Sequence, residues 1–169
     1  AGVVIVDQVS KRWVDAGFER AWLTAPVPGY AAPTPVLGDL VRIAKSYNDG
    51  GLFGLFGTAA PILAVASIGV IALIVWFQAR AATGGPILLT VALGLLLGGA
   101  LGNLLDRLRL GYVIDFVDMG LGSLRFFTFN VADSAVSLAI LGLLLLALFG
   151  DRLGGTDEVT DETADEATD

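Results

Sequence analysis

The stretch from residue 59 to residue 77, AAPILAVASIGVIALIVWF, decides the class of fold, because Ser67 is its only clearly polar residue. Two other stretches are similar: residues 86–105, interrupted by Thr90 and Asn103, and residues 129–149, whose polar groups lie mainly near the beginning. A helix needs about 20 mainly apolar residues to cross a bilayer. With 55% hydrophobic residues and a mean hydropathy of +0.76, the 169-residue chain is predicted to be an integral membrane protein.

A fourth span is implied at the start of the chain, where only the apolar segment AGVVIV precedes Asp7. The chain begins with alanine, so we expect this first helix to be truncated; a cleaved signal peptide is the alternative interpretation. The predicted fold is an all-α membrane protein, a four-transmembrane-helix bundle with a small extracytoplasmic loop region that contains β-structure. We place its spans at about 1–16, 58–78, 86–106 and 129–150, within a single domain, residues 1–150.

The chain contains no cysteine and no histidine. This excludes disulfides, thiolate catalysis, cysteine metal sites, a Ser-His-Asp triad and an HExxH zinc helix. Carboxylates, Lys, Ser, Thr and Tyr remain as catalytic groups, and we expect no metal, no other cofactor and no nucleic-acid partner. The net charge of −7 belongs to residues 151–169, which hold 8 of the 17 acidic and 1 of the 10 basic residues. This acidic tail is predicted to be disordered, because it has almost no apolar surface to bury.

Three connections separate the expected spans: residues 10–57, 80–85 and 106–128. The first contains prolines at positions 26, 28, 33 and 35, which prevent a continuous helix there. It also contains Trp13, Trp22 and Tyr30, and Trp and Tyr prefer the headgroup layer. We therefore expect short strands that lie on the membrane surface; an irregular proline-rich connector is the alternative.

Because successive spans alternate in direction, the first and third connections lie on the same side of the membrane. The polar residues at the span ends gather on that side: Asp7, Asn48, Asn103, Asp106, Asp115, Asn130 and Asp133. The positive-inside rule would place this side in the cytoplasm, since it carries eight Lys and Arg residues and the other side carries only Arg80 and Arg152. We give this count less weight, because several of these bases look committed to local partners and residues missing from the first helix would also count.

Asp115 and Asp133 are the candidate catalytic residues. An ionisable side chain at the edge of the hydrocarbon layer is costly and indicates a functional site. If the two carboxyl groups face each other across one water molecule, they would share a proton, so that one deprotonates the water while the other protonates a carbonyl oxygen. The alternative for Asp133 is purely structural: Asn130 would cap the helix with Asp133 at its third position, as in a capping box.

The other motifs have structural alternatives as well. Asn103 and Arg107 lie one turn apart at the end of the third span. The structural alternative is that Arg107 only stabilises the C-terminus of this helix, where a cation is favourable. Gly94, Gly98 and Gly102 form a stripe of small residues that we interpret as helix packing. Asp7 and Lys11 are four residues apart, which is the spacing of a helical ion pair. Residues 48–51, NDGG, have the composition of a turn.

Five segments resemble the lipoprotein signal peptidases, also called signal peptidase II: DQVSK at 7–11, NDGGLFG at 48–54, GGALGNLLDR at 98–107, VIDF at 113–116 and FNVADS at 129–134. The resemblance covers almost the whole chain up to Phe149 and implies that Asp115 and Asp133 are the catalytic dyad of an intramembrane aspartyl protease. Other matched positions are implied to support the dyad or bind substrate: Asn48, Gly50, Asn103, Asp106, Arg107, Asn130 and Ala132. Among these Asp106 looks more structural, as do Asp7 and Lys11.

The resemblance also implies the substrate and the setting. The substrate would be a bacterial prolipoprotein whose cysteine already carries diacylglycerol, cut just before that cysteine, and a globomycin-like cyclic peptide would inhibit the enzyme. A monomer is expected in the cytoplasmic (inner) membrane, in contact with lipid, with its active site near the extracytoplasmic face. Leu52 departs from the small residue usual in the family. A proton-coupled carrier that uses the same buried carboxyls is the alternative function, and a four-span scaffold is a third.

Overall fold

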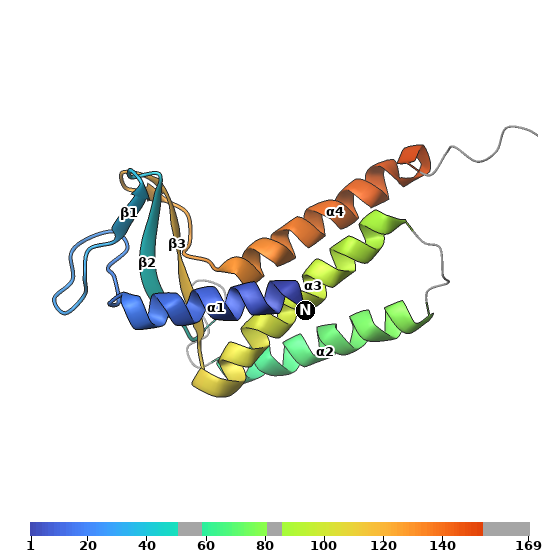
Figure 1. Cartoon of the computed structure of the whole chain (residues 1–169), viewed down its shortest axis with the longest axis horizontal. Helices are drawn as coiled ribbons and strands as arrows, with labels where there is room; N and C mark the ends of the chain where they lie inside the picture. The colour runs from blue at the N-terminus through green and yellow to red at the C-terminus, as the bar shows by residue number, and fades with distance from the viewer. Residues whose placement is uncertain (51–58, 81–85, 154–169) are drawn as a thin grey trace, which may run out of the picture.

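The computed structural model describes residues 1–50, 59–80 and 86–153 and consists of helices beside a small sheet (Figure 1). The helices are α1 (Gly2–Gly17), α2 (Ala60–Arg80), α3 (Ile87–Leu110) and α4 (Val131–Leu153). The strands are β1 (Thr34–Leu37), β2 (Val41–Asn48), β3 (Val113–Leu121) and β4 (Leu124–Arg125). The prediction of a disordered tail from residue 151 is wrong for residues 151–153, which continue α4. The predictions for Leu52, and for the tail from residue 154 onward, concern residues outside these ranges.

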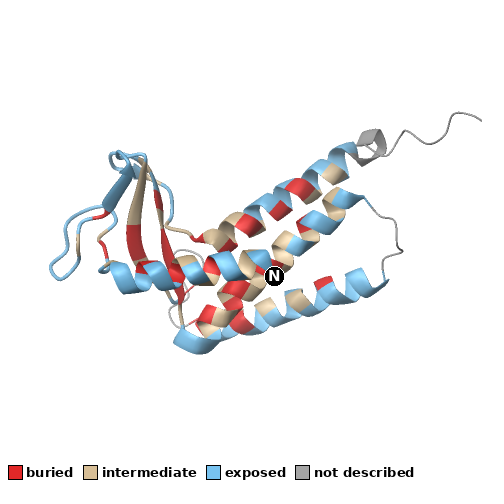
Figure 2. Ribbon diagram, in the orientation of Figure 1, coloured by how far each residue is buried: buried red, intermediate tan, exposed pale blue. Residues whose placement is uncertain are grey.

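Three of the helices in the described ranges are long and apolar enough to cross a membrane: α2, α3 and the Val131–Phe149 part of α4. Much of their surface is exposed to the surroundings of the protein (Figure 2), including apolar side chains such as Ile62, Ile87 and Leu148. Such a surface suits a lipid environment. Helix α1 matches the expected position of the first span but is more polar, because Asp7 and Lys11 lie on its buried face. Three spans are therefore supported, and the fourth stays a prediction.

Helix α3 lies between α2 and α4 and also packs against α1 (Figure 1). Two members of the predicted glycine stripe make the close contact with α1: a Cβ on Gly98 would lie 2.7 Å from the Cβ of Val3, and one on Gly102 would lie 2.6 Å from Oδ2 of Asp7. Gly99, outside the stripe, allows the approach of α4, since its Cβ would lie 2.5 Å from the Ala132 carbonyl oxygen. Gly94 has no such neighbour in the described part of the chain, so the packing interpretation is wrong for that residue.

The sheet is antiparallel with the order β1-β2-β3-β4, and it lies at the end of the bundle reached by the C-terminal end of α1 (Figure 1). The expectation of short strands in the first connection is correct, with β1 and β2 following the proline-rich segment. The third connection was expected to be a loop from 106 to 128, but α3 continues to Leu110. Gly111, with φ of 80°, ends that helix in the left-handed conformation. Strand β3 then pairs along β2.

Candidate active site

The two candidate catalytic aspartates come from different elements and line the same cavity. Asp115 lies in β3 and is 3% exposed, whereas Asp133 lies in the first turn of α4 and is half-buried. The cavity has a volume of about 680 Å³. The fold therefore brings together the two carboxyl groups that the sequence singled out, although 17 residues separate them along the chain.

Asn130 joins the two carboxyl groups. Its side-chain Nδ2 donates to Oδ1 of Asp115 at 2.7 Å, and its backbone N–H donates to Oδ2 of Asp133 at 3.1 Å. Its Oδ1 accepts the backbone N–H of Asp133 at 3.0 Å, so Asn130 and Asp133 form the reciprocal cap predicted as the structural alternative. The capping interpretation and the dyad are compatible, because the same bonds that begin α4 also hold Asp133 beside the cavity.

Two further amides donate to the dyad. Asn48, at the end of β2, donates from Nδ2 to Oδ2 of Asp115 at 3.0 Å. Asn103, in α3, donates from Nδ2 to Oδ1 of Asp133 at 2.8 Å. Each carboxyl group thus accepts two N–H donors, one from Asn130 and one from an amide on a neighbouring element. These bonds fix the orientation of both groups.

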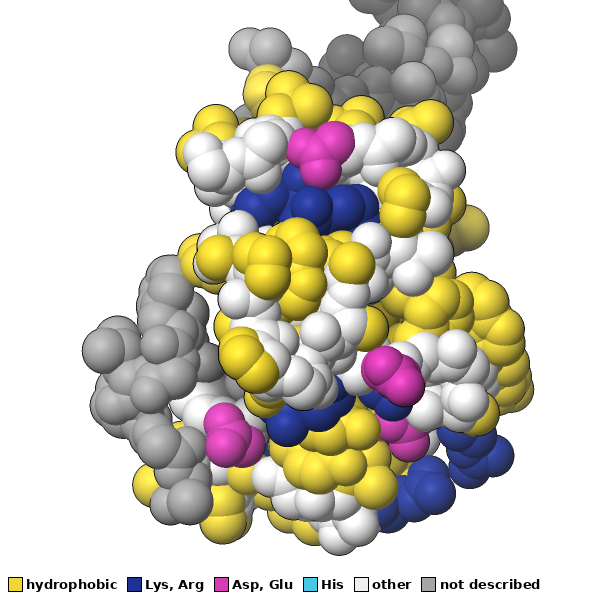
Figure 3. All heavy atoms as spheres, turned by 90° about the vertical axis from the view of Figure 1, so that its left-hand side faces the viewer, with side chains coloured by type: hydrophobic (Ala, Val, Ile, Leu, Met, Phe, Trp, Pro, Cys, Tyr) yellow, Lys and Arg dark blue, Asp and Glu magenta, His cyan; other side chains and the backbone are white. Residues whose placement is uncertain are grey.

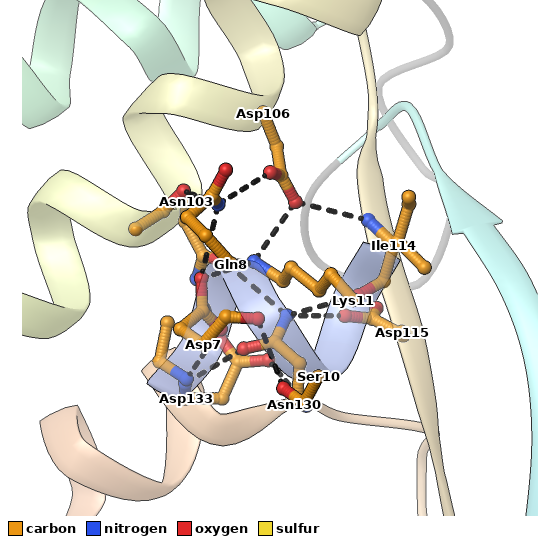
Figure 4. A network of polar contacts seen from close by, with 12 residues as sticks. Asp7, Gln8, Ser10, Lys11, Asn103, Asp106, Ile114, Asp115, Asn130 and Asp133 are labelled. Atoms are coloured by element: carbon orange, nitrogen blue, oxygen red, sulfur yellow. Dashed lines mark hydrogen bonds and ion pairs between the residues drawn. The ribbon is translucent and has the colours of Figure 1, made fainter. Parts of the chain in front are cut away.

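A buried ion cluster adjoins the dyad in the same network of polar contacts (Figure 4). Nζ of Lys11 donates to Asp7 at 2.9 Å, to Asp106 at 2.8 Å and to Oδ1 of Asn103 at 2.9 Å. Because Lys11 occupies the amide oxygen of Asn103, the Nδ2 of the same amide is left to face Asp133. The expectation that Asp7 and Lys11 form an ion pair is correct, and Asp106 completes it.

The carboxylates of this cluster also hold backbone groups. Oδ1 of Asp7 accepts the N–H of Ala132 at 3.0 Å, and Oδ2 of Asp106 accepts the N–H of Ile114 at 3.3 Å. Ala132 and Ile114 precede Asp133 and Asp115 respectively, so the cluster positions the backbone beside both aspartates. Sequence reasoning assigned no role to Gln8, whose Nε2 donates to Asp106 at 2.8 Å; its place between Asp7 and Lys11 was the only signal.

Two other predicted residues lie at the site with fewer contacts. Arg107 donates from Nη1 to the carbonyl oxygen of Asn103 at 3.5 Å, while its buried Nε has no hydrogen-bond partner among the described residues. Gly50 is buried and lines the cavity together with Asp49.

Burial raises the pKa of Asp115 from its ordinary value of 3.8 to about 7. The negative charge of Asp133 adds to this increase. The hydrogen bonds from Asn48 and Asn130 and the charge of Lys11 oppose it without cancelling it. A carboxyl group with this pKa can hold a proton at neutral pH, which is what a general acid needs.

The remaining lining of the cavity includes aromatic and charged side chains. Phe126, Phe127 and Phe129 line it, as do Asp118 and Arg125. Asp118 is 1% exposed and accepts from Arg125 and from Arg42 of β2, with Nη2 distances of 2.9 and 2.6 Å. Sequence reasoning missed this charged cluster, because nothing in the spacing of the three residues shows that the sheet brings them together.

The described residues contain no group of three acidic side chains that could hold a metal ion. The described residues thus combine helices that are apolar enough to cross a membrane with a cavity lined by two carboxyl groups, which defines a multi-pass membrane protein suited to acid–base chemistry. A family model described as Signal peptidase (SPase) II matches residues 1–149. The chain belongs to the signal peptidase II family, and is therefore a membrane protease.

Individual relatives agree with this assignment. The chain is 37% identical to a lipoprotein signal peptidase from Dehalococcoides mccartyi, over 90% of this chain and 88% of the relative. It is 38% identical to a lipoprotein signal peptidase from Methylorubrum extorquens, over 85% of this chain and 79% of the relative. A solved structure described as a bacterial membrane enzyme, determined by the in meso method, is similar with a TM-score of 0.72 and 26% identity. That similarity covers 94% of this chain and 90% of the other.

Proposed function

We propose that this chain is an aspartyl endopeptidase that removes the signal peptide from diacylglyceryl-modified bacterial prolipoproteins by cutting just before the lipidated cysteine. The observation that carries the proposal is the pair Asp115 and Asp133 on one cavity, held by a common residue, Asn130. Membership in the signal peptidase II family supports the reaction class. The same membership counts against a proton-coupled carrier.

The two aspartates would have different roles in the reaction. Asp115 is almost fully buried, and its raised pKa favours the protonated form. Asp133 is half-buried at the N-terminus of α4 and lines the cavity, where it is more accessible to a water molecule than Asp115 is. We therefore assign the base to Asp133 and the acid to Asp115.

The reaction then follows in two steps. Asp133 takes a proton from a water molecule as the water oxygen bonds to the carbonyl carbon, and Asp115 gives its proton to the carbonyl oxygen. The resulting tetrahedral diol collapses when Asp133 gives its proton to the cysteine nitrogen and the C–N bond breaks. Asp115 recovers its proton from a hydroxyl of the diol, so both aspartates return to their starting states.

The cavity suits an apolar peptide that enters from the membrane. Its aromatic wall of Phe126, Phe127 and Phe129 offers apolar surface to a signal peptide, while the diacylglyceryl chains would remain in the bilayer. Arg107, whose Nε lacks a partner in the described part of the protein, is a candidate donor to a peptide carbonyl. Asn48 and Gly50 would form the opposite edge of the binding site, and a globomycin-like cyclic peptide would occupy the same cavity.

The setting would be the bacterial inner membrane, with the cavity near the extracytoplasmic face and the enzyme acting as a monomer. The unfavourable positive-inside count is weakened by the pairing of several of the bases. Lys11, Arg42, Lys45 and Arg125 all form ion pairs with neighbouring carboxylates.

The test is a gel-shift cleavage assay on a diacylated prolipoprotein with Asp115→Asn and Asp133→Asn tested separately. Each substitution is expected to abolish cleavage while leaving the thermal unfolding temperature close to that of the wild type or higher. Asp39→Asn is the matched control, because Asp39 is half-exposed and pairs with Arg42 and Arg125. The Asp39→Asn enzyme should cleave the substrate at nearly the wild-type rate. Normal cleavage by either dyad variant would remove that residue from the mechanism.

A further inference from the structure

A second, smaller hollow is lined in part by Lys11 and Asp106 of the ion cluster and shares no lining residue with the peptide cavity. It has a volume of about 80 Å³ and is formed where the C-terminal halves of α1 and α3 meet the start of β3. Its lining includes Gln8, Arg12 and Asp15 of α1 together with Arg109 and Leu110 of α3. The proposed peptidase activity uses none of these side chains to contact substrate.

Arg12 and Arg109 bring positive charge to the hollow that no ion pair neutralises within the described ranges, whereas Lys11 and Asp106, which also line it, are paired with each other. Arg12 and Arg109 form no ion pair within the described ranges, and the one hydrogen bond of the Arg109 side chain goes from Nη1 to Oε1 of Gln8 at 3.4 Å. The nearby acid Asp15 already accepts from Nζ of Lys45 at 3.3 Å and from the hydroxyl of Tyr47 at 3.1 Å. Two guanidinium groups that form no ion pair in the described part of the chain therefore line one small concave site.

Its surroundings place the hollow at the lipid headgroup layer. Trp13, the neighbour of Arg12, is 57% exposed, and Leu108 and Leu110, on either side of Arg109, are 64% and 41% exposed. Exposed Trp beside exposed Leu and Arg is the composition of a membrane interface, where a Trp ring and an Arg head both find polar partners. The same end of the protein shows Lys and Arg side chains next to hydrophobic ones (Figure 3).

We propose that Arg12 and Arg109 bind the phosphate of an anionic phospholipid at this hollow. Guanidinium groups match phosphate oxygens with paired N–H donors, and the two cations exceed the single charge of a phosphodiester. A headgroup with its own cation would meet repulsion from the second arginine, so an anionic lipid such as phosphatidylglycerol is preferred over a zwitterionic one. Bound there, the lipid would hold α1 to α3 directly beside the Lys11–Asp106 pair.

The experiment uses the full chain, purified and freed of lipid in detergent, with phosphatidylglycerol or phosphatidylcholine of identical acyl chains added back. Native mass spectrometry counts retained lipid, and thermal unfolding measures protection. The wild type is expected to retain phosphatidylglycerol and to unfold at a higher temperature with it than with phosphatidylcholine. Arg12→Gln and Arg109→Gln should each weaken retention about tenfold, the effect of losing one charge-assisted contact.

Controls make the result decisive. Arg80→Gln removes an exposed arginine from the opposite end of the bundle, where it lies over the Trp76 ring, and should retain phosphatidylglycerol as the wild type does. Arg12→Lys and Arg109→Lys keep the positive charge and should retain more phosphatidylglycerol than the glutamine variants. They also provide a test if a glutamine variant fails to fold. Equal retention of both lipids by the wild type, or unchanged retention by the glutamine variants, overturns the proposal. So does equal protection by soluble glycerol phosphate, which would indicate a site for free anions.

Discussion

Asn130 and Asp133 bond to each other in both directions at the start of α4, through the N–H of Asn130 to Oδ2 of Asp133 at 3.1 Å and the N–H of Asp133 to Oδ1 of Asn130 at 3.0 Å. The same asparagine also donates to Asp115 at 2.7 Å. One residue thus starts a membrane helix and sets the relative positions of the two proposed catalytic groups. Stability and catalysis are coupled at this point.

The two roles of Asn130 can be separated by substitution. Asn130→Ala removes both the cap and the bond to Asp115, and is expected to cost about 1 kcal/mol in the free energy of unfolding and about a hundredfold in cleavage rate. Asn130→Ser keeps an oxygen that can cap α4 but has no N–H to reach Asp115. The serine variant should therefore recover the stability measured by thermal unfolding without recovering the rate. Equal rates for wild type and serine variant would show that the bond to Asp115 is dispensable.

The pH dependence of cleavage follows from the raised pKa of Asp115, about 7. The proposed acid must be protonated, so the cleavage rate should fall as pH rises above about 7 and should level off below it. A prolipoprotein assay across this range measures the effect in wild type, with Asp39→Asn expected to give the same profile. A rate that still rises well above pH 7 would contradict the assignment of Asp115 as the acid.

The same shift predicts how stability depends on pH. Since the pKa of Asp115 is higher in the folded protein than its ordinary value of 3.8, the folded state binds more protons than the unfolded state between these values. The stabilisation is complete below pH 3.8 and is lost as pH rises through about 7. Asp115→Asn cannot titrate, so the difference in unfolding temperature between it and the wild type should widen in favour of the variant over this interval. A constant difference would mean that Asp115 is not buried as described.

The sequence predicted the apolar helices, and the polar residues at their ends, better than the connections between them. Apolar runs locate α2, α3 and α4 because hydrocarbon contact imposes a strong compositional constraint, and the polar residues at the ends of those runs stand out for the same reason. Strand β3 was expected to be loop, since its signal depends on pairing with β2. The cluster of Arg42, Asp118 and Arg125 could not be predicted, because it depends on how distant strands pair. Strand register, unlike hydropathy, is not evident from residues that are neighbours in the sequence.

Lys11 is predicted to be essential to the fold although it is remote from the substrate. Lys11→Met leaves Asp7 and Asp106 buried without their cation and should reduce the free energy of unfolding by about 3–5 kcal/mol. Lys45→Met is the comparison, since the carboxylate of its partner Asp15 is 44% exposed and can be hydrated; its cost should be about 1 kcal/mol or less.

Chemical denaturation in detergent would measure both lysine variants. Adding Asp106→Asn to Lys11→Met should restore part of the loss, because one uncompensated charge is removed. An equal loss of unfolding free energy in the two lysine variants would show that the buried Lys11 cluster contributes no more to stability than the Lys45–Asp15 pair.

Glycine-to-alanine substitutions in α3 are expected to differ in their effect on stability and cleavage, because only some of these glycines lie against a neighbouring helix. Gly99→Ala would place a Cβ 2.5 Å from the rigid backbone oxygen of Ala132, and Gly102→Ala would place one 2.6 Å from Oδ2 of Asp7. Each should cost about 1–3 kcal/mol by forcing helices apart, and should slow cleavage because Ala132 and Asp7 position the start of α4.

Gly94→Ala is the matched control for this series, since its Cβ meets no atom of the described residues within 4 Å. Its unfolding temperature should be unchanged or slightly raised, because alanine favours the helix over glycine. Measured unfolding temperatures and cleavage rates should therefore order the variants with Gly94→Ala closest to wild type. A Gly94→Ala protein as damaged as Gly99→Ala would mean that helix propensity or lipid contact, and not the approach of α1 and α4, explains the glycines of α3.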